Sequence, residues 1–311
     1  MIFRSHRGSP LRFIQRMLTR GSVVALLGLM SLPISAGTPM PSVATPTIGS
    51  LPETFLSEFG DAFHDYARYW TAPLTWNDTE WGTFWTIMGT TGALIIVDRP
   101  IYTTFDKKSW TPVKQSLDIF HQLGQWQYPG IVLAGIYTSS FVLEDSKLER
   151  ASRIAIKSFV FQTLVNQGLK NLIYRTKIDD PYDFRIGPPN WRIPSDGAFP
   201  SGHASNTWAV MSAFAIAYRD DPIIPSLCYG AATISSCLLI TNQDHWISDI
   251  VLGAALGYYS AEWMASIDDH RYRQRASNSG SSPTSSRTPR PITIQPVMSS
   301  DITGIGISVP F

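Results

Sequence analysis

Apolar residues along this chain recur with the three-to-four-residue spacing of helices, in stretches that polar residues, Gly and Pro separate. An amphipathic, aromatic-rich stretch at 55–70 comes first. The stretches after it predict core helices at 81–97, 129–143, 154–174, 203–218, 223–241 and 250–264. The pattern therefore predicts an all-α fold, a helical bundle of about six core helices with a short C-terminal β-like tail.

Composition divides the chain into five parts. Residues 1–36 predict a signal peptide or an N-terminal anchor, and 37–80 predict a linker with an amphipathic, aromatic-rich segment. Residues 81–268 form the helical domain. The Ser-, Arg- and Pro-rich stretch 269–291 predicts a flexible linker, and the alternating apolar and polar residues of 292–311 predict a terminal hairpin.

The N-terminus has the layout of a secretory signal. Basic residues precede the apolar run 23–34, and Ser35, Ala36 and Gly37 follow it. Cleavage after Ala36 and retention as an uncleaved anchor both stay open, because Ile34 is bulkier than the small residue usual at its position. We therefore expect an exported protein, in the inner membrane or the periplasm.

Charge and polarity narrow the classes of partner. A formal net charge of +1 gives no reason to expect nucleic acid. Charged residues make up 16% of the chain, below the roughly 25% of soluble domains, which favours a membrane or a heavily buried bundle. The run 222–243 is long and charge-free enough to span a bilayer, whereas Gln162, Asn166 and Lys170 suit a helix inside a bundle.

Three places combine ionisable residues with the ends of predicted helices, and each has an ordinary structural explanation. Lys170 could extend its charge from a buried helix, Ser201 could cap a helix, and Asp249 could stabilise a helix start. Together the three places describe a phosphate site: Lys170 with Arg175 and Lys177, then P-S-G-H at 200–203, then His245 with Asp249.

The chemistry of such a site follows from helix geometry. The backbone N–H groups of Gly202 and His203 at a helix start, with the Ser201 hydroxyl, suit an anion. His245 and Asp249 are four residues apart, so on a helix the carboxylate lies beside the imidazole and can orient it. The other ring nitrogen could then attack phosphorus, while His203 protonates the departing oxygen as general acid.

These residues carry a resemblance to a known superfamily. The stretch F-P-S-G-H-A-S at 199–205, with H-W-I-S-D at 245–249 and a lysine-bearing helix before them, resembles type 2 phosphatidic acid phosphatases, bacterial acid phosphatases and vanadium haloperoxidases. That superfamily has the motifs K-x6-R-P, P-S-G-H and S-R-x5-H-x3-D. The second is complete here and the third keeps its His and Asp, over roughly residues 85–265.

The sequence departs from the motifs in the phosphate grip. Lys177 and Ile178 stand where the first motif has Arg and Pro, and Leu239 stands where the third has Arg. Lysine keeps the charge but loses the planar fork, and leucine loses both charge and donors. Three arginines in or beside the segment between the first two motifs are candidates to compensate: Arg175, Arg185 and Arg192.

The resemblance implies a phosphatase that hydrolyses a phosphomonoester or diphosphate, with a lipid as the favoured substrate class, through a phosphohistidine on His245. In that mechanism Asp249 supports His245 and His203 is the acid. The groups that hold the phosphoryl oxygens are Lys170, Lys177, Ser201 and Gly202. No metal and no cofactor are implied, and the expected partners are a phosphorylated lipid or other phosphate ester and a membrane, with the site facing the periplasm.

Two alternatives stay open. A catalytically weakened or inactive homologue would bind a phosphorylated ligand, and Leu239 and Lys177 are its main support. A vanadium-dependent haloperoxidase shares the motifs but ranks lower, because vanadate also needs the missing arginine.

Overall fold

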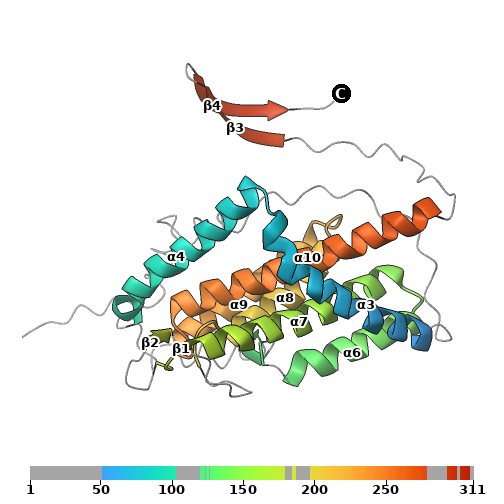
Figure 1. Ribbon diagram of the computed structural model, residues 1–311, viewed down its shortest axis with the longest axis horizontal. Helices are drawn as coiled ribbons and strands as arrows, with labels where there is room; N and C mark the ends of the chain where they lie inside the picture. Colours follow the sequence, from blue (N-terminus) through green and yellow to red (C-terminus); the bar gives the residue numbers. More distant parts are fainter. Residues whose placement is uncertain are drawn as a thin grey trace, which may run out of the picture. The chain divides into compact units, whose positions relative to one another are not determined.

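The computed structural model describes residues 51–102, 120–122, 124–125, 127–178, 184–186, 197–278, 293–299 and 302–308. Its helices (Figure 1) are α3 Leu51–Thr71, the 3-10 turn η2 Ala72–Thr75, α4 Asp78–Tyr102, α6 Gln127–Val142, α7 Ser146–Leu172, α8 Gly202–Ala217, α9 Ile223–Thr241 and α10 Ile247–Asn278. Each predicted core helix overlaps one of these, so the all-α prediction is confirmed. The signal or anchor expected at 1–36 lies outside the described residues.

Short strands complete the fold. Strand β1 (Ile173–Arg175) continues directly from α7 and pairs antiparallel with β2 (Phe184–Ile186), with Tyr174 opposite Arg185. In the C-terminal tail, β3 (Thr293–Ser299) pairs antiparallel with β4 (Ile302–Ser308). This hairpin belongs to a compact unit separate from the one that contains the helical core.

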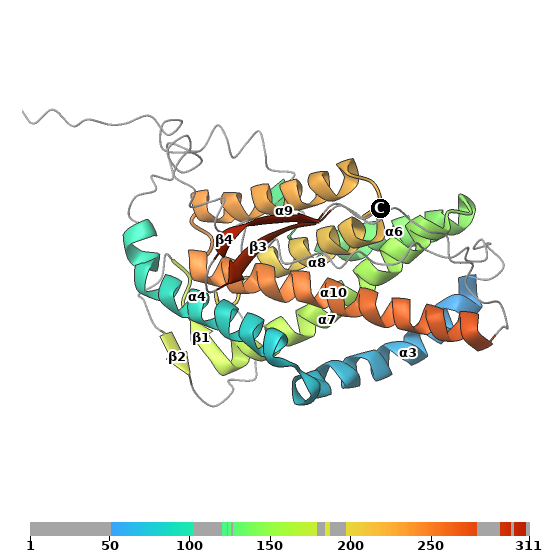
Figure 2. The ribbon, with the colours of Figure 1, turned by 90° about the horizontal axis from the view of Figure 1, so that it is seen from above.

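The centre of the bundle is built where α6, α7, α8 and α10 meet. Leu133 of α6, Phe161 of α7, Ile216 of α8 and Met264 of α10 are buried in one apolar cluster. Figure 2 shows α7 and α10 crossing each other, with α8 between their upper parts in this view, and α9 packs on α8. Burying side chains of this size stabilises the fold by about 1.5–3 kcal/mol each, so this cluster holds the helices together.

Helix α3 is attached to this core through aromatic residues. The ring of Tyr69 lies 4.2 Å from that of Phe161 and 5.6 Å from that of Trp263, and Tyr66 stacks on Phe161 at 5.2 Å, measured between centroids. The amphipathic stretch around 55–70 therefore packs on the bundle through its aromatic face.

Polar side chains of α7 point into the bundle, as their number predicts for an interior helix. Gln162 and Asn166 are buried, and their amide groups donate hydrogen bonds to Asn206 and to the Ser205 hydroxyl of α8, the latter at 3.2 Å. Buried polar groups stabilise only when they are paired, and these pairs fix the register of α7 against the first turns of α8.

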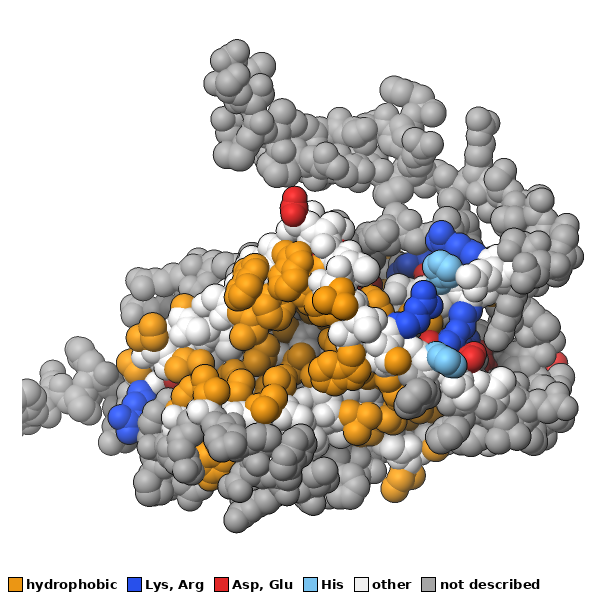
Figure 3. Space-filling model, viewed as in Figure 1, with side chains coloured by type: hydrophobic (Ala, Val, Ile, Leu, Met, Phe, Trp, Pro, Cys, Tyr) orange, Lys and Arg blue, Asp and Glu red, His pale blue; other side chains and the backbone are white. Residues whose placement is uncertain are grey.

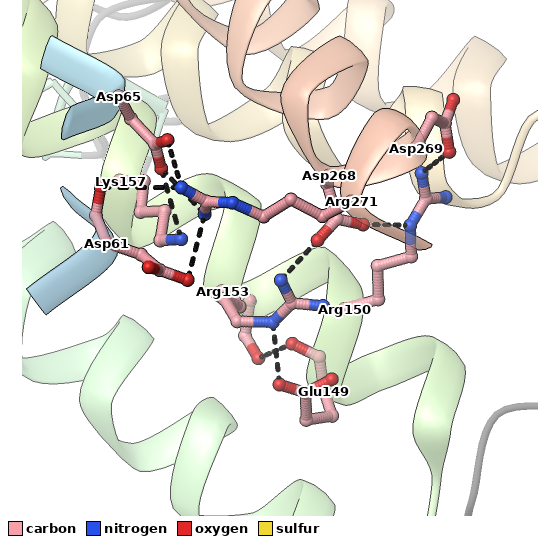
Figure 4. Close-up of polar contacts among 10 residues, drawn as sticks. Asp61, Asp65, Glu149, Arg150, Arg153, Lys157, Asp268, Asp269 and Arg271 are labelled. Carbon is pink, nitrogen blue, oxygen red and sulfur yellow. Dashed lines mark hydrogen bonds and ion pairs between the residues drawn. The ribbon is translucent and has the colours of Figure 1, made fainter. Parts of the chain in front are cut away.

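A network of charges joins α3, α7 and α10 (Figure 4). Arg271 of α10 donates to the buried Asp65 of α3, and Lys157 of α7 lies 3.5 Å from the same carboxylate. Arg150 of α7 bonds Asp268 of α10 at 2.7 Å. The residues of α10 that make these contacts are helical. The helix continues to Asn278, past the boundary expected at 268.

Apolar side chains also remain on the surface, and Figure 3 shows them gathered on one face. Large exposed ones include Trp85 and Ile96 of α4, Ile131 of α6, and Ile223 and Leu227 of α9. Within the described ranges, α9 alone is long and apolar enough to cross a membrane, and most of its apolar stretch is not buried inside the bundle. This agrees with the expectation for 222–243.

Two glycines let α10 cross α8 with backbones in contact. A Cβ at Gly253 would lie 2.4 Å from the carbonyl oxygen of Ser201, and one at Gly257 would lie 2.3 Å from that of Ser205. Real Cβ atoms do not approach a carbonyl oxygen this closely, so both positions require glycine. The crossing places the start of α8 beside the first turns of α10.

Replacing Gly253 with Ala should therefore be destabilising, because the added methyl group forces α8 and α10 apart. We expect the free energy of unfolding to fall by about 1–3 kcal/mol in urea denaturation. Gly168→Ala in α7 is the matched control: a Cβ there meets nothing within 4 Å, so the higher helix propensity of Ala should leave stability unchanged or raised. Equal losses in both variants would contradict the close crossing.

Candidate active site

The start of α8 is the anion-suited helix end that the sequence predicts. The buried Ser201 is its N-cap, and the hydroxyl accepts a hydrogen bond of 3.2 Å from the Ala204 N–H. The Ser201 N–H donates to the Asp249 carbonyl oxygen at 2.9 Å, which ties this turn to α10. The peptide bond Phe199–Pro200 before it is cis. The first turn of α8, with Gly202 and His203, is thus fixed at both ends.

The two histidines of the motifs come together here. The ring centroids of His203 and His245 are 6.2 Å apart, with His245 largely buried on the turn before α10. Its Nδ1 lies 3.7 Å from an Asp249 carboxylate oxygen, which is beyond hydrogen-bond length. The same Asp249 oxygen accepts from the Trp246 N–H at 3.1 Å. A small movement of the imidazole would complete the pair.

The basic residues expected to grip phosphate occupy different environments. Lys170, at the end of α7, is buried and donates from Nζ to the Gly197 carbonyl oxygen at 2.5 Å. Lys177 is exposed, two residues beyond β1. Arg185 is in β2, and Arg192 lies outside the described residues. The structure therefore brings Lys170 to the loop just before the start of α8.

Arg175 is fully buried and contacts Asp249, which in turn faces His245. Its Nη1 donates to the Asp249 carboxylate at 2.6 Å and to the Ser248 hydroxyl at 2.7 Å, while Nη2 donates to Asp98 at 2.8 Å. The guanidinium carbon lies 4.9 Å from the centroid of the Trp246 ring, a cation–π contact. These donors face carboxylates, so in this arrangement Arg175 orients Asp249.

Asp98, which the sequence analysis did not single out, completes the group. It is buried in α4, and its carboxylate accepts from the Ser248 N–H at 3.1 Å and from the Ser248 hydroxyl at 2.5 Å, besides Arg175. A lone acidic residue directly after the apolar stretch 81–97 was the available signal. Its partners come from residues far along the chain, so only the fold shows the group.

His121 is a second residue that sequence reasoning missed. Its Nε2 lies 3.1 Å from an Asp244 carboxylate oxygen, and its ring centroid is 5.2 Å from that of His203. A histidine in a stretch without helical periodicity carried no signal. Gly124 allows this contact, because a Cβ there would lie 2.7 Å from the His203 carbonyl oxygen.

The surroundings of His203 disfavour its charged form. Burial is the largest cause that lowers the pKa of His203, to about 4, and the neighbouring His245 and His121 lower it further. Asp244 raises this pKa and Lys170 lowers it, both to smaller extents. In the ligand-free protein at neutral pH, His203 is therefore a neutral imidazole.

Leu239 fills the position of the arginine in the third motif. It is fully buried in α9. It packs in a small apolar cluster with Ile250 and with Ala204, the residue that follows His203. Hydrocarbon thus lies beneath the start of α8 where the motif has a cation. Among the described residues, no group of three or more His, Cys, Asp or Glu side chains is placed to hold a metal ion.

Residues 153–273 match the family model of the PAP2 superfamily. This segment holds α8 and both motif histidines, so the match to this family model agrees with the resemblance drawn from the motifs. Among solved structures, a transmembrane PAP2-type phosphatidylglycerolphosphate phosphatase from Bacillus subtilis matches at 13% identity, over 69% of this chain and 96% of that one, with a TM-score of 0.39. No curated protein matches.

Asp98→Asn keeps the shape of the side chain but removes the charge that faces Arg175. Because the amide nitrogen of Asn cannot accept, at least one buried donor of Arg175 or Ser248 loses its acceptor, and we expect the free energy of unfolding in urea to fall by about 1–3 kcal/mol. Asp220→Asn is the control, since it removes an exposed carboxylate 3.4 Å from Lys147 and should change stability by less than about 0.5 kcal/mol. Similar values for the two variants would argue against a buried network.

Proposed function

We propose that the protein is a phosphoric ester hydrolase that transfers the phosphoryl group of its substrate to His245 and then to water. The observation that carries the proposal is the pair His203 and His245, with rings 6.2 Å apart at the N-terminus of α8, inside the segment that matches the PAP2 superfamily model. A helix start favours an anion, and two imidazoles on either side of it suit nucleophile and acid.

In the first step, Nε2 of His245 attacks phosphorus and the bond from phosphorus to the leaving oxygen breaks. The proton of His203 moves to that oxygen, so the leaving group departs as a neutral alcohol. Three groups stabilise the negative charge on the phosphoryl oxygens: the N–H groups of the first turn of α8, the Ser201 hydroxyl and the ammonium group of Lys170. Lys177 joins them if its exposed side chain folds over the site.

In the second step, a water molecule attacks the phosphorus of the phosphohistidine. The proton of the water moves to His203, which now acts as base, and the phosphorus–nitrogen bond breaks. His245 is restored, and His203 stays protonated while phosphate is bound and gives up this proton when phosphate leaves. The carboxylate of Asp249 favours the positively charged phosphoimidazole, because it lies 3.7 Å from Nδ1.

The acid role requires a protonated His203, although its pKa in the free protein is lowered to about 4. A phosphate dianion bound at the start of α8 brings negative charge beside this imidazole and favours its protonated form. A substrate that binds as its monoanion also carries the proton with it. Substrate binding thus supplies the charge that makes His203 an acid.

The exposed apolar surface of the protein supports a lipid substrate and a membrane location. Exposed apolar side chains on α4, α6 and α9 would lie in water in a soluble protein, and α9 has the length and hydropathy to cross a bilayer. A phosphorylated lipid would reach the site from such a surface. We propose an exported protein whose site faces the periplasm, as the N-terminal signal pattern favours.

Three substrates test the reaction class: phosphatidic acid, an isoprenyl diphosphate and a soluble aryl phosphate. We expect hydrolysis of at least one lipid substrate, and a fall in kcat of roughly a thousandfold or more in His245→Gln. His203→Gln should lose about 10²–10⁴-fold on substrates with poor leaving groups and less on the aryl phosphate. Labelled substrate should leave acid-labile phosphate on protein that retains His245.

His270→Gln is the control for both histidine variants, because His270 is exposed on α10. Its activity should equal that of the unaltered protein. Hydrolysis of the soluble compound alone would rule out the lipid class, and an active His245→Gln variant would rule out the phosphohistidine route.

A second function is favoured by Leu239, which leaves hydrocarbon in place of a cation at the phosphate grip. A protein that binds a phosphorylated ligand with weak or no turnover needs the helix start and Lys170 but not the arginine. Loss of one charge at a phosphoryl transition state can cost several kcal/mol, so turnover would be slowed by orders of magnitude.

Leu239→Arg separates the two functions. Burying an unpaired guanidinium should lower the melting temperature, since such a charge costs about 3–5 kcal/mol, and inorganic phosphate should restore part of the loss if the side chain reaches the site. A gain in hydrolysis at saturating substrate would show a weakened enzyme, and binding without hydrolysis in both forms would favour the binding function. Leu239→Met controls for the change in packing.

A further inference from the structure

A second histidine–carboxylate pair, His121 with Asp244, flanks the candidate acid and takes no part in the two steps above. The imidazole Nε2 and the carboxylate oxygen are 3.1 Å apart, and both side chains reach solvent, with 17% of His121 and 39% of Asp244 exposed. Both groups are therefore open to a bound molecule, unlike the buried Arg175 and Asp98.

The pair is held against the site by the fold. Gly124, three residues after His121, has its backbone against that of His203, and its carbonyl oxygen accepts from the buried Asn206 side chain of α8 at 2.9 Å. His121 therefore reaches His203 from a backbone segment anchored on α8, while Asp244 comes from the turn just before His245. The two partners bridge both elements that carry the catalytic histidines.

The position of the pair follows from the direction of phosphoryl transfer. Attack by His245 and departure of the leaving group take place on opposite sides of phosphorus, and the acid His203 stands on the departing side. The ring of His121 is 5.2 Å from that of His203. The pair therefore borders the space into which the leaving group extends.

The chemistry of the pair suits one kind of leaving group. An ionised carboxylate only accepts hydrogen bonds, so Asp244 matches hydroxyl groups, which can donate. A second phosphate group also only accepts when it is fully ionised, and its negative charge is repelled by a carboxylate. His121 offers an imidazole nitrogen beside the carboxylate and partly offsets its charge when protonated.

We propose that His121 and Asp244 form a leaving-group subsite that accepts a neutral, hydroxyl-bearing alcohol and disfavours a second phosphate group. The protein would then favour phosphomonoesters over diphosphates. This inference rests on the proposed function, because it takes His203 as the acid and His245 as the nucleophile.

Two variants of the one pair should act in opposite directions. Asp244→Asn removes the repelling charge, whereas His121→Gln removes the imidazole beside the carboxylate. The probes are methylphosphonate and methylenebisphosphonate, whose affinities are measured by titration calorimetry at fixed ionic strength. The same variants are assayed for kcat/KM on a phosphomonoester and a diphosphate of one alcohol.

Asp244→Asn should tighten binding of the bisphosphonate by roughly tenfold and leave methylphosphonate within twofold. His121→Gln should weaken binding of the bisphosphonate several-fold, and the ratio of diphosphate to monoester hydrolysis should move the same way as binding in each variant. The controls Asp220→Asn and His270→Gln alter an exposed carboxylate and an exposed histidine away from the site and should change neither ratio.

An unchanged bisphosphonate preference in both variants, or a change in the same direction in both, would overturn the subsite. Damage to the structure would change binding in the same direction in both variants, so it cannot explain opposite shifts. Phosphonate binding with the expected shifts but without hydrolysis of any ester would support the subsite and refute the hydrolase. Absence of binding of either probe to the unaltered protein would refute both.

Discussion

Arg175 lies between two buried aspartates, and the arrangement of the candidate site depends on this contact. Its guanidinium bonds Asp98 of α4 at 2.8 Å and Asp249 of α10 at 2.6 Å, while the arginine itself belongs to the strand that follows α7. Two carboxylates and one guanidinium leave an excess negative charge away from water. The hydroxyl and N–H of Ser248 also donate to this group, which spreads that charge over further hydrogen bonds.

This arrangement has a consequence for His245, the proposed nucleophile. Asp249 faces both the guanidinium of Arg175 and the imidazole of His245. The carboxylate that supports His245 is therefore itself held in place by Arg175. A carboxylate with such a partner keeps its orientation. Arginine is suited to this position because its planar fork holds two acceptors in a fixed geometry, whereas the donors of a lysine ammonium group rotate.

The sequence predicted the parts of the fold that depend on local pattern. The apolar period located the core helices, and P-S-G-H with H-x3-D located the two histidines, because a cap, a helix start and an i,i+4 pair are local features. Asp98 and His121 were missed because their partners lie far along the chain, 77 and 150 residues from Asp98 and 123 residues from His121. For Arg175 the sequence indicated a basic residue near the site, but burial and two opposing carboxylates decide its role, and both are tertiary. The burial of Leu239 likewise follows from how α9 packs on α8.

The close crossing of α8 and α10 also bears on how such a site can change over time. His203 is in the first turn of one helix and His245 directly before the other, and Gly253 and Gly257 set the spacing of these two helices through backbone contact. The separation of the two imidazoles is thus a property of a helix pair and not of the connecting segments. Substitutions in those segments can alter which molecules enter while the reacting geometry stays the same, so substrate preference and chemistry are free to evolve independently.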